Sequence, residues 1–295
     1  MTEHSFPISI LVTGASGQLG SELKDLSKSF PDFKFIFAGK QELSIINKDA
    51  IQKFFDTHKI DFCINCAAYT AVDKAESEKE KAYLINDTAV GHLAAICSSH
   101  KTKLIHISTD YVYDGSEKQP LKESDKKGPL NVYGESKLMG EKSALSKNPE
   151  TLIIRTSWVY SYYGHNFVKT MIRLLKEKKE LNVVNDQIGS PTNAADLAFV
   201  IMQIIKMHLE GKKINGILNY SNTGETSWFQ FAQFIKEQTG SQCEIHPVTT
   251  AQYATPATRP EYSVLDTTLI KSLTGIKIPF WKDSASACIH RLIKD

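Results

Sequence analysis

The stretch Ile8-Ser-Ile-Leu-Val-Thr-Gly14-Ala-Ser-Gly17-Gln-Leu-Gly20 decides the fold. An apolar run leads into glycines at GxxGxxG spacing, and an amphipathic segment follows to about Ser29. Glycines allow a tight turn and let backbone N–H groups approach a pyrophosphate at a helix N-terminus. A glycine pattern is informative only between a strand and a helix, which is its context here. The stretch therefore predicts a strand, a dinucleotide-binding turn and a helix.

After this stretch, short apolar runs alternate with amphipathic stretches along the first half of the chain. The expected strands are 8–13, 33–38, 61–66, 103–108 and 151–156. The expected helices are 18–29, 50–58, 78–99, 133–146, 164–178, 196–210 and 226–239, the last with Thr226 as N-cap, and 248–262 is expected to be loop. Strands that alternate with helices predict an α/β fold with a doubly wound parallel sheet, a Rossmann fold.

The second half of the chain is less regular and predicts a second unit. We expect residues 1–158 plus about 184–222 to form the dinucleotide-binding Rossmann domain. Residues from about 159–183 plus 223–295 are expected to form a smaller C-terminal α/β domain that closes over the substrate.

Composition excludes several classes of partner. The net charge of +2 makes no case for binding nucleic acid or an anionic membrane. No stretch reaches the roughly 18 apolar residues that a membrane span needs. The N-terminus lacks a basic region followed by an apolar core, so it does not read as a secretory signal. A cytoplasmic location is expected, and an odd number of cysteines, five, agrees with it.

Cys63 and Cys66 have CxxC spacing but do not predict a redox or metal site. They lie in 61–66, which is expected to be a buried strand. Residues three apart on a strand point to opposite faces, so the two sulfurs would diverge. No cluster elsewhere in the sequence has the spacing of metal ligands, and no metal is expected.

The end of the second expected strand bears on the choice of cofactor. An acid there holds the ribose 2′-hydroxyl of NADH, whereas a basic residue suits the 2′-phosphate of NADPH. The chain has Ala38-Gly39-Lys40, so NADPH is favoured, and Glu42 keeps NADH open. The loop after the third strand, with Ala67 and Ala68, lies where ligands bind in such sheets. The candidate cofactor-binding residues are Gly14, Gly17, Gln18, Leu19, Gly20, Lys40, Cys66, Ala67, Ala68, Tyr133 and Lys137.

Tyr133 and Lys137 form the candidate catalytic pair. A carbonyl that is reduced needs a proton, and a phenol can supply it if nearby positive charge stabilises the phenolate. Four residues apart on a helix, the two side chains share a face. Thr109, at the end of a strand, offers a hydroxyl to the substrate oxygen. Ser108 is the alternative for that role.

Together these motifs resemble the extended short-chain dehydrogenase/reductases, over nearly the whole chain. The Ser-Thr-Asp-Tyr-Val and Arg-Thr-Ser-Trp-Val-Tyr stretches are the most specific to one branch of that family. The stretches that carry the resemblance are 13–20, 65–76, 108–115, 129–141, 155–160, 185–192 and 255–260.

The resemblance implies a fold, a reaction and a set of residues. It implies reduction of the 4-keto group of a dTDP-linked 6-deoxyhexose, with Tyr133 as acid, Lys137 as its partner and Thr109 as the third member. Asp110 and Trp158 would then lie against the sugar nucleotide, and Asn166 and Arg259 are candidates for its diphosphate. Some relatives form a magnesium-linked dimer through glutamates, of which this chain matches only Glu22, so a homodimer stays open.

Two other functions stay open from the sequence. The first is another nucleotide-sugar reductase or epimerase on the same scaffold, which the stereochemistry of the product would distinguish. The second is a non-catalytic, NADP-binding regulatory subunit, since that of methionine adenosyltransferase resembles the same branch. An intact Tyr133, Lys137 and Thr109 argue against an inactive site.

Overall fold

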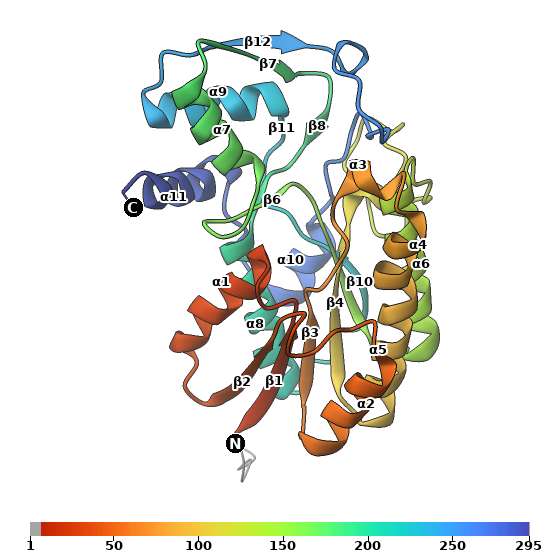
Figure 1. The fold of residues 1–295 in the computed structure, drawn as a ribbon. Helices are drawn as coiled ribbons and strands as arrows, with labels where there is room; N and C mark the ends of the chain where they lie inside the picture. The colour runs from red at the N-terminus through yellow and green to blue at the C-terminus, as the bar shows by residue number, and fades with distance from the viewer. Residues whose placement is uncertain (1–6, 295) are drawn as a thin grey trace.

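A six-stranded parallel sheet forms the centre of the molecule in the computed structural model, which describes residues 7–294 (Figure 1). Its strand order is β10-β5-β4-β3-β1-β2, and every adjacent pair is parallel. The strands are β1 (Ile8–Thr13), β2 (Phe33–Ala38), β3 (Phe62–Asn65), β4 (Lys103–Thr109), β5 (Leu152–Thr156) and β10 (Gly216–Asn219). The predicted doubly wound α/β fold is confirmed.

Helices cover both faces of this sheet, because the strands are apolar on both sides. One face packs against α1 (Gln18–Leu26), α8 (Ala194–Leu209) and α10 (Thr268–Thr274). The other face packs against α2 (Lys48–Thr57), α5 (Ala89–Ser99) and α6 (Val132–Lys147). Short helices complete this part of the chain: η1 (Ser27–Ser29), α3 (Val72–Ala75), α4 (Lys79–Tyr83) and η3 (Asp110–Val112).

The order of the strands creates a crevice at their carboxyl ends. From β1 the chain passes to β2 on one side, whereas β3, β4 and β5 follow on the other. Ligands of doubly wound sheets bind where the strand order reverses in this way. The register places Thr13 beside Asn65 at this point, so the glycine turn and the loop after β3 are neighbours.

A second hydrophobic core lies beyond the carboxyl ends of the large sheet (Figure 1). It is built from α7 (Phe167–Glu177), α9 (Trp228–Thr239), α11 (Trp281–Lys294) and the parallel pair β7 (Glu180–Val184) and β12 (Glu244–Val248). The remaining elements are β6 (Val159–Tyr160), β8 (Ile188–Gly189), β9 (Thr192–Asn193), β11 (Thr226–Ser227) and η4 (Thr250–Gln252). The domain boundaries drawn from the sequence stay a prediction.

Three of the expected elements differ from the structure, and the first is the loop over 248–262, which contains the short helix η4. The helix expected over 78–99 contains a π-turn, η2 (Leu84–Thr88), between α4 and α5. There the buried Asn86 side chain binds both backbone groups of Tyr69 and the hydroxyl of Ser136, contacts that periodicity does not encode. The N-cap of α9 is Ser227 rather than Thr226, because Ser227 forms a capping box with Gln230.

The cysteines of the CxxC spacing pack on opposite faces of the sheet, as predicted, although Cys66 lies one residue beyond the end of β3. Cys63 belongs to the core on the α5 side, and Cys66 packs against the core on the α1 side. Burial raises the pKa of the Cys66 thiol, the reverse of what a reactive thiolate needs. Within residues 7–294, no helix is long and apolar enough to span a membrane.

Candidate active site

The glycine turn between β1 and α1 is shaped for close backbone approach. Gly14 has a φ of +61°, and a Cβ there would lie 2.6 Å from the amide nitrogen of Ala67. A Cβ on Gly20 would meet the Cα of Ala15 at 2.6 Å. The N-cap of α1 is Gly17, which offers no side-chain cap, and the first turn of α1 has no acidic residue. Its backbone N–H groups therefore remain available to an anionic phosphate.

A cavity of about 330 Å³ lies on one side of this turn, beyond the end of β2. Lys40 lines it, and so does Lys81 of α4. Glu42 also reaches the end of β2, where its carboxylate accepts a hydrogen bond from the backbone N–H of Gly39 at 2.9 Å. The cavity is otherwise lined by Gly14, Ser16, Gly17, Leu43, Ser44, Ile45, Ile46, Cys66, Ala67, Ala68, Leu84 and Ile85.

A larger cavity, of about 610 Å³, shares Gly17, Cys66 and Ala68 with the first. The two cavities therefore lie next to each other at the glycine turn. The larger one brings together Gln18, Leu19, Thr109, Asp110, Tyr133, Lys137 and Trp158, all named from the sequence. It also contains residues that sequence reasoning missed, among them Tyr111, Thr156, His165 and Trp228.

Tyr133 stands in the first turn of α6, whose N-cap Asn131 accepts a hydrogen bond from Gly134 at 2.8 Å. The hydroxyl of Thr109 lies close enough to the phenol to act on its pKa, in the lowering direction. Burial raises the pKa of Tyr133 to about 12, and the nearby Asp110 carboxylate adds to that. The phenol therefore holds its proton at neutral pH, the state required of an acid.

Lys137 lies one turn further along α6 and is buried. Its ammonium donates to the backbone carbonyl of Ile107 at 2.7 Å, and its Nζ lies 3.4 Å from Nε2 of His106. Burial lowers the pKa of Lys137 to about 8, while the carboxylate of Glu141 acts in the opposite direction. Lys137 and Tyr133 both line the larger cavity.

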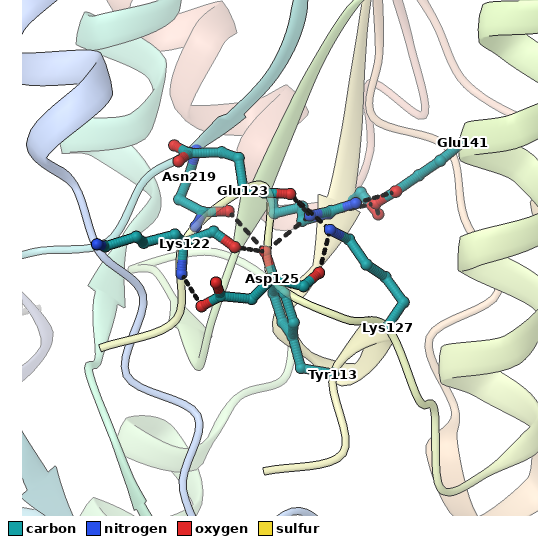
Figure 2. A network of polar contacts seen from close by, with 9 residues as sticks. Tyr113, Lys122, Glu123, Asp125, Lys127, Glu141 and Asn219 are labelled. Atoms are coloured by element: carbon teal, nitrogen blue, oxygen red, sulfur yellow. Dashed lines mark hydrogen bonds and ion pairs between the residues drawn. The ribbon is translucent and has the colours of Figure 1, made fainter. Parts of the chain in front are cut away.

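Ser108, the alternative to Thr109, has its hydroxyl committed elsewhere. It donates to the carboxylate of Glu141 at 2.5 Å, away from Tyr133. Glu141 is also held by Arg155 through two hydrogen bonds of 2.9 and 2.6 Å, and both side chains are buried. Arg155 further donates to the hydroxyl of Tyr113 at 2.7 Å, within the network of Figure 2. The geometry thus favours Thr109 over Ser108 as the partner of Tyr133.

The same network fastens the loop that follows β4. Tyr113 donates to the carbonyl of Lys122 at 2.9 Å, and Glu123 accepts from the backbone of Asn219 at 2.8 Å (Figure 2). Asn219 is the last residue of β10. These bonds anchor the loop to β10 at the edge of the large sheet. Because Arg155 binds both Tyr113 and Glu141, the same network also joins the loop to α6.

Trp158 closes one side of the larger cavity. Its φ is +46°, a left-handed conformation that is uncommon for a bulky residue. Its ring stacks on that of Trp228 with centroids 3.6 Å apart. A Cβ on Gly189 would lie 2.5 Å from the Trp158 ring, so only glycine fits behind it. The strained backbone is held by this packing and marks a candidate binding surface.

Asn166 and Arg259, the candidates for a diphosphate, have other partners in the structure. Asn166 is the N-cap of α7, and its amide group donates to Gln18 at 3.0 Å and to the carbonyl of Ser161 at 2.7 Å. Arg259 forms two hydrogen bonds with the carboxylate of Asp73, of 3.0 and 2.9 Å. Neither is among the described residues that line the larger cavity. Their roles toward a diphosphate stay a prediction.

Glu22 is the one glutamate of this chain that matches the pattern of the magnesium-linked dimers. Its side chain is buried within its own chain. Its carboxylate accepts a hydrogen bond from Ser161 at 2.5 Å. Burial raises the pKa of this carboxyl above its usual range. In the part of the chain that the structure describes, no group of three or more His, Cys, Asp or Glu side chains is placed to hold a metal ion.

The family model described as RmlD substrate binding domain matches residues 8–294. The chain belongs to the RmlD family. A dTDP-4-dehydrorhamnose reductase of Sinorhizobium fredii is 39% identical to this chain over 290 residues, which cover 96% of this chain and 97% of the relative. The enzyme of that name from Aggregatibacter actinomycetemcomitans is 40% identical, over 92% of this chain and 95% of its own length.

Solved structures of the family agree over the whole fold. A dTDP-4-dehydrorhamnose reductase of Clostridium acetobutylicum superposes with a TM-score of 0.92 at 41% identity, covering 97% of this chain and 100% of that one. The enzyme of the same name from Bacillus anthracis, solved in complex with NADP, has a TM-score of 0.91 at 36% identity over the same coverage.

Proposed function

We propose that this protein is an NADPH-dependent reductase of the 4-keto group of dTDP-4-dehydro-β-L-rhamnose, with dTDP-L-rhamnose as the product. The observation that carries the proposal is the meeting of Thr109, Tyr133 and Lys137 in one cavity that continues to the glycine turn. Close relatives named for this reaction match nearly the full length of the chain. An NADP complex of a family member supports the choice of cofactor.

The residues around the glycine turn fit a nicotinamide dinucleotide. A Cβ at Gly14 or Gly20 would collide with the backbone that shapes the turn, and the open N-terminus of α1 offers N–H groups to the pyrophosphate. Gly17, Gln18 and Leu19 would hold the phosphates. Cys66, Ala67 and Ala68 would contact the adenosine of the cofactor. When bound, the reduced nicotinamide supplies the hydride.

The chain's own residues then manage the proton. Tyr133 gives its phenolic proton to the sugar oxygen as negative charge develops there, and Thr109 donates a hydrogen bond that keeps this oxygen in place. The ammonium of Lys137 stabilises the resulting phenolate. Asp110 and the face of Trp158 lie against the sugar, with Asn166 and Arg259 toward the diphosphate.

An assay of nicotinamide oxidation tests the proposal directly. We expect rapid oxidation of NADPH with dTDP-4-dehydro-β-L-rhamnose, and NMR of the product should identify dTDP-L-rhamnose. A product with another configuration at C4, or turnover only with a different keto-sugar, would favour another nucleotide-sugar reductase or epimerase. Protein that binds NADPH yet oxidises none of it would favour the regulatory-subunit alternative.

The choice between NADPH and NADH is expected to depend on Lys40. Lys40→Ala should weaken binding of NADPH about tenfold, the loss of one exposed charge-assisted contact, and leave binding of NADH unchanged. Lys34→Ala is the matched control, because Lys34 is an exposed lysine at the opposite end of β2. Titration calorimetry with both cofactors measures the two affinities. Equal weakening of both cofactors by Lys40→Ala would contradict this assignment.

We also propose a cytoplasmic location and a homodimer. All five cysteines are free thiols, which suits a reducing compartment. The dimer rests on the family resemblance, and analytical ultracentrifugation would decide it.

A further inference from the structure

A line of buried polar side chains runs from the glycine turn to Lys137 across three neighbouring strands. It begins at Thr13 on β1, passes through Asn65 on β3 and His106 on β4, and ends at Lys137. The register of the sheet sets these residues side by side, Thr13 against Asn65 and Asn65 against His106. All of these side chains are buried, so their hydrogen bonds must be satisfied within the protein.

The orientation of the Asn65 amide follows from one unambiguous donor. The backbone N–H of Ala67 donates to one side-chain atom of Asn65 at 3.3 Å, so that atom must be the oxygen. The hydroxyl of Thr13 donates to the same oxygen at 2.6 Å. The NH₂ group of Asn65 therefore faces Nδ1 of His106, 3.0 Å away.

This orientation decides the tautomer of His106. An NH₂ group can only donate, so Nδ1 of His106 must accept, and the single proton of the neutral ring sits on Nε2. Burial and the charge of Lys137 lower the pKa of His106 well below its usual value, so the ring is neutral. The Nε2–H group then points at Nζ of Lys137.

Two groups that can only donate face each other if Lys137 is an ammonium ion. Their separation of 3.4 Å is longer than an ordinary N–H hydrogen bond. A neutral amine would instead accept from Nε2–H while it keeps its contact with the carbonyl of Ile107. The arrangement thus disfavours the charged form of the lysine.

We propose that His106 is a positioning residue, held in its Nε2–H tautomer by Asn65 and Thr13, that lowers the proton affinity of Lys137. Through this line of contacts, Thr13, which precedes the glycine turn, is connected to Lys137, the partner of the proposed acid Tyr133. The proposal rests on the role proposed above for Lys137, but it concerns a protonation state and can be tested without turnover.

Other groups around Lys137 act on its charge and stay constant in the test. Glu141 of α6 acts on Lys137 directly, and Arg155 of β5 is the partner of Glu141. Tyr133 of α6 and Asp110 of η3 line the same cavity as Lys137. The carboxylate of Glu141 favours the ammonium form of Lys137. None of these groups is altered by a substitution at His106.

The tautomer can be read in the unmodified protein. Nitrogen-15 NMR of ring-labelled histidine distinguishes a protonated Nε2 from a protonated Nδ1, and the signal of His106 is identified by its loss in His106→Asn. We expect the Nε2–H tautomer at neutral pH. A ring that is protonated on Nδ1, or on both nitrogens, would overturn the proposal.

The effect on Lys137 is measured with a matched pair of variants. His106→Asn keeps an acceptor near the position of Nδ1 and removes the Nε2–H donor, whereas His106→Gln keeps a donor that reaches toward Lys137. Carbon-13 NMR of lysine labelled at Cε follows each titration, with the Lys137 signal identified by its loss in Lys137→Arg. The midpoint should rise by about one pH unit in His106→Asn and stay near the native value in His106→Gln.

A merely structural role for His106 predicts a different pattern. Both variants would then lose stability and leave the midpoint of Lys137 where it was, which would contradict the proposal. If His106→Asn does not fold, His106→Leu, which also removes the Nε2–H donor, takes its place: the midpoint of Lys137 should rise, and an unchanged midpoint would contradict the proposal. Failure of the keto-sugar assay would overturn the proposed function without moving either NMR result.

Discussion

Tyr133→Phe is expected to lower the turnover of dTDP-4-dehydro-β-L-rhamnose about a thousandfold, the usual size of a general-acid contribution. The variant keeps the ring, which packs edge-to-face with Tyr111 at 5.7 Å between centroids, and removes only the hydroxyl that carries the proton. Because burial raises the pKa of Tyr133 to about 12, that proton is present throughout the neutral range. NADPH affinity should change little, since the phosphate-binding turn lies on a different element.

Tyr83→Phe is the matched control for this experiment. Tyr83→Phe also removes a phenolic hydroxyl beside α6, near Glu135, but Tyr83 lines neither cavity among the residues described. Steady-state rates with saturating NADPH, together with calorimetric NADPH affinities, separate chemistry from binding. Turnover of Tyr133→Phe within tenfold of the native rate would remove Tyr133 from the role of acid.

Arg155→Met is expected to lower the free energy of unfolding by about 3–5 kcal/mol, the cost of leaving a buried charge without its partner. Arg155 and Glu141 are 1% and 2% exposed, and their closest N–O distance is 2.6 Å. The variant would leave the Glu141 carboxylate buried with only Ser108 as a described hydrogen-bond donor. It would also remove the Arg155 hydrogen bonds to the hydroxyl of Tyr113 and to the carbonyl of Glu123, which weakens the anchoring of the loop after β4.

Arg173→Met is the matched control, because Arg173 lies as close to its acidic partner as Arg155 lies to Glu141. Arg173 and Glu177 are also 2.6 Å apart, but they are 59% and 49% exposed on the surface of α7. Exposed pairs contribute at most about 1 kcal/mol, so this variant should stay close to the native protein. Urea denaturation measures the free energy of unfolding of both variants. If both lose a similarly small amount of stability, the buried Arg155–Glu141 pair is not a major source of stability.

The buried ion pair also explains why α6 can carry a lysine in the core. Glu141 lies one turn beyond Lys137, so the same helix face presents a cation to the cavity and an anion to Arg155. Periodicity predicted the helix and the shared face of Tyr133 and Lys137. It did not predict the ion pair with Arg155, because this contact depends on how α6 packs back against β5 in the fold.

Site residues that lie close together in the sequence were the most predictable. Gly14, Gly17 and Gly20 serve one turn, and Tyr133 and Lys137 one helix face, so spacing alone indicates their geometry. The opposite faces of Cys63 and Cys66 follow from the alternation of a strand. The preference for Thr109 over Ser108 stays a prediction, and the contact that supports it, that of Ser108 with Glu141, appears only in the fold.

The sequence by itself determined the strand–glycine turn–helix opening, the doubly wound order of elements and the Tyr133–Lys137 pair, because each depends on local periodicity or short spacing. Only the tertiary structure decided which distant residues meet. Asn65 reaches His106 through strand register, Trp228 stacks on Trp158, and Arg259 pairs with Asp73. These contacts join segments far apart in the chain, and strand order and helix packing, which no local pattern encodes, bring them together.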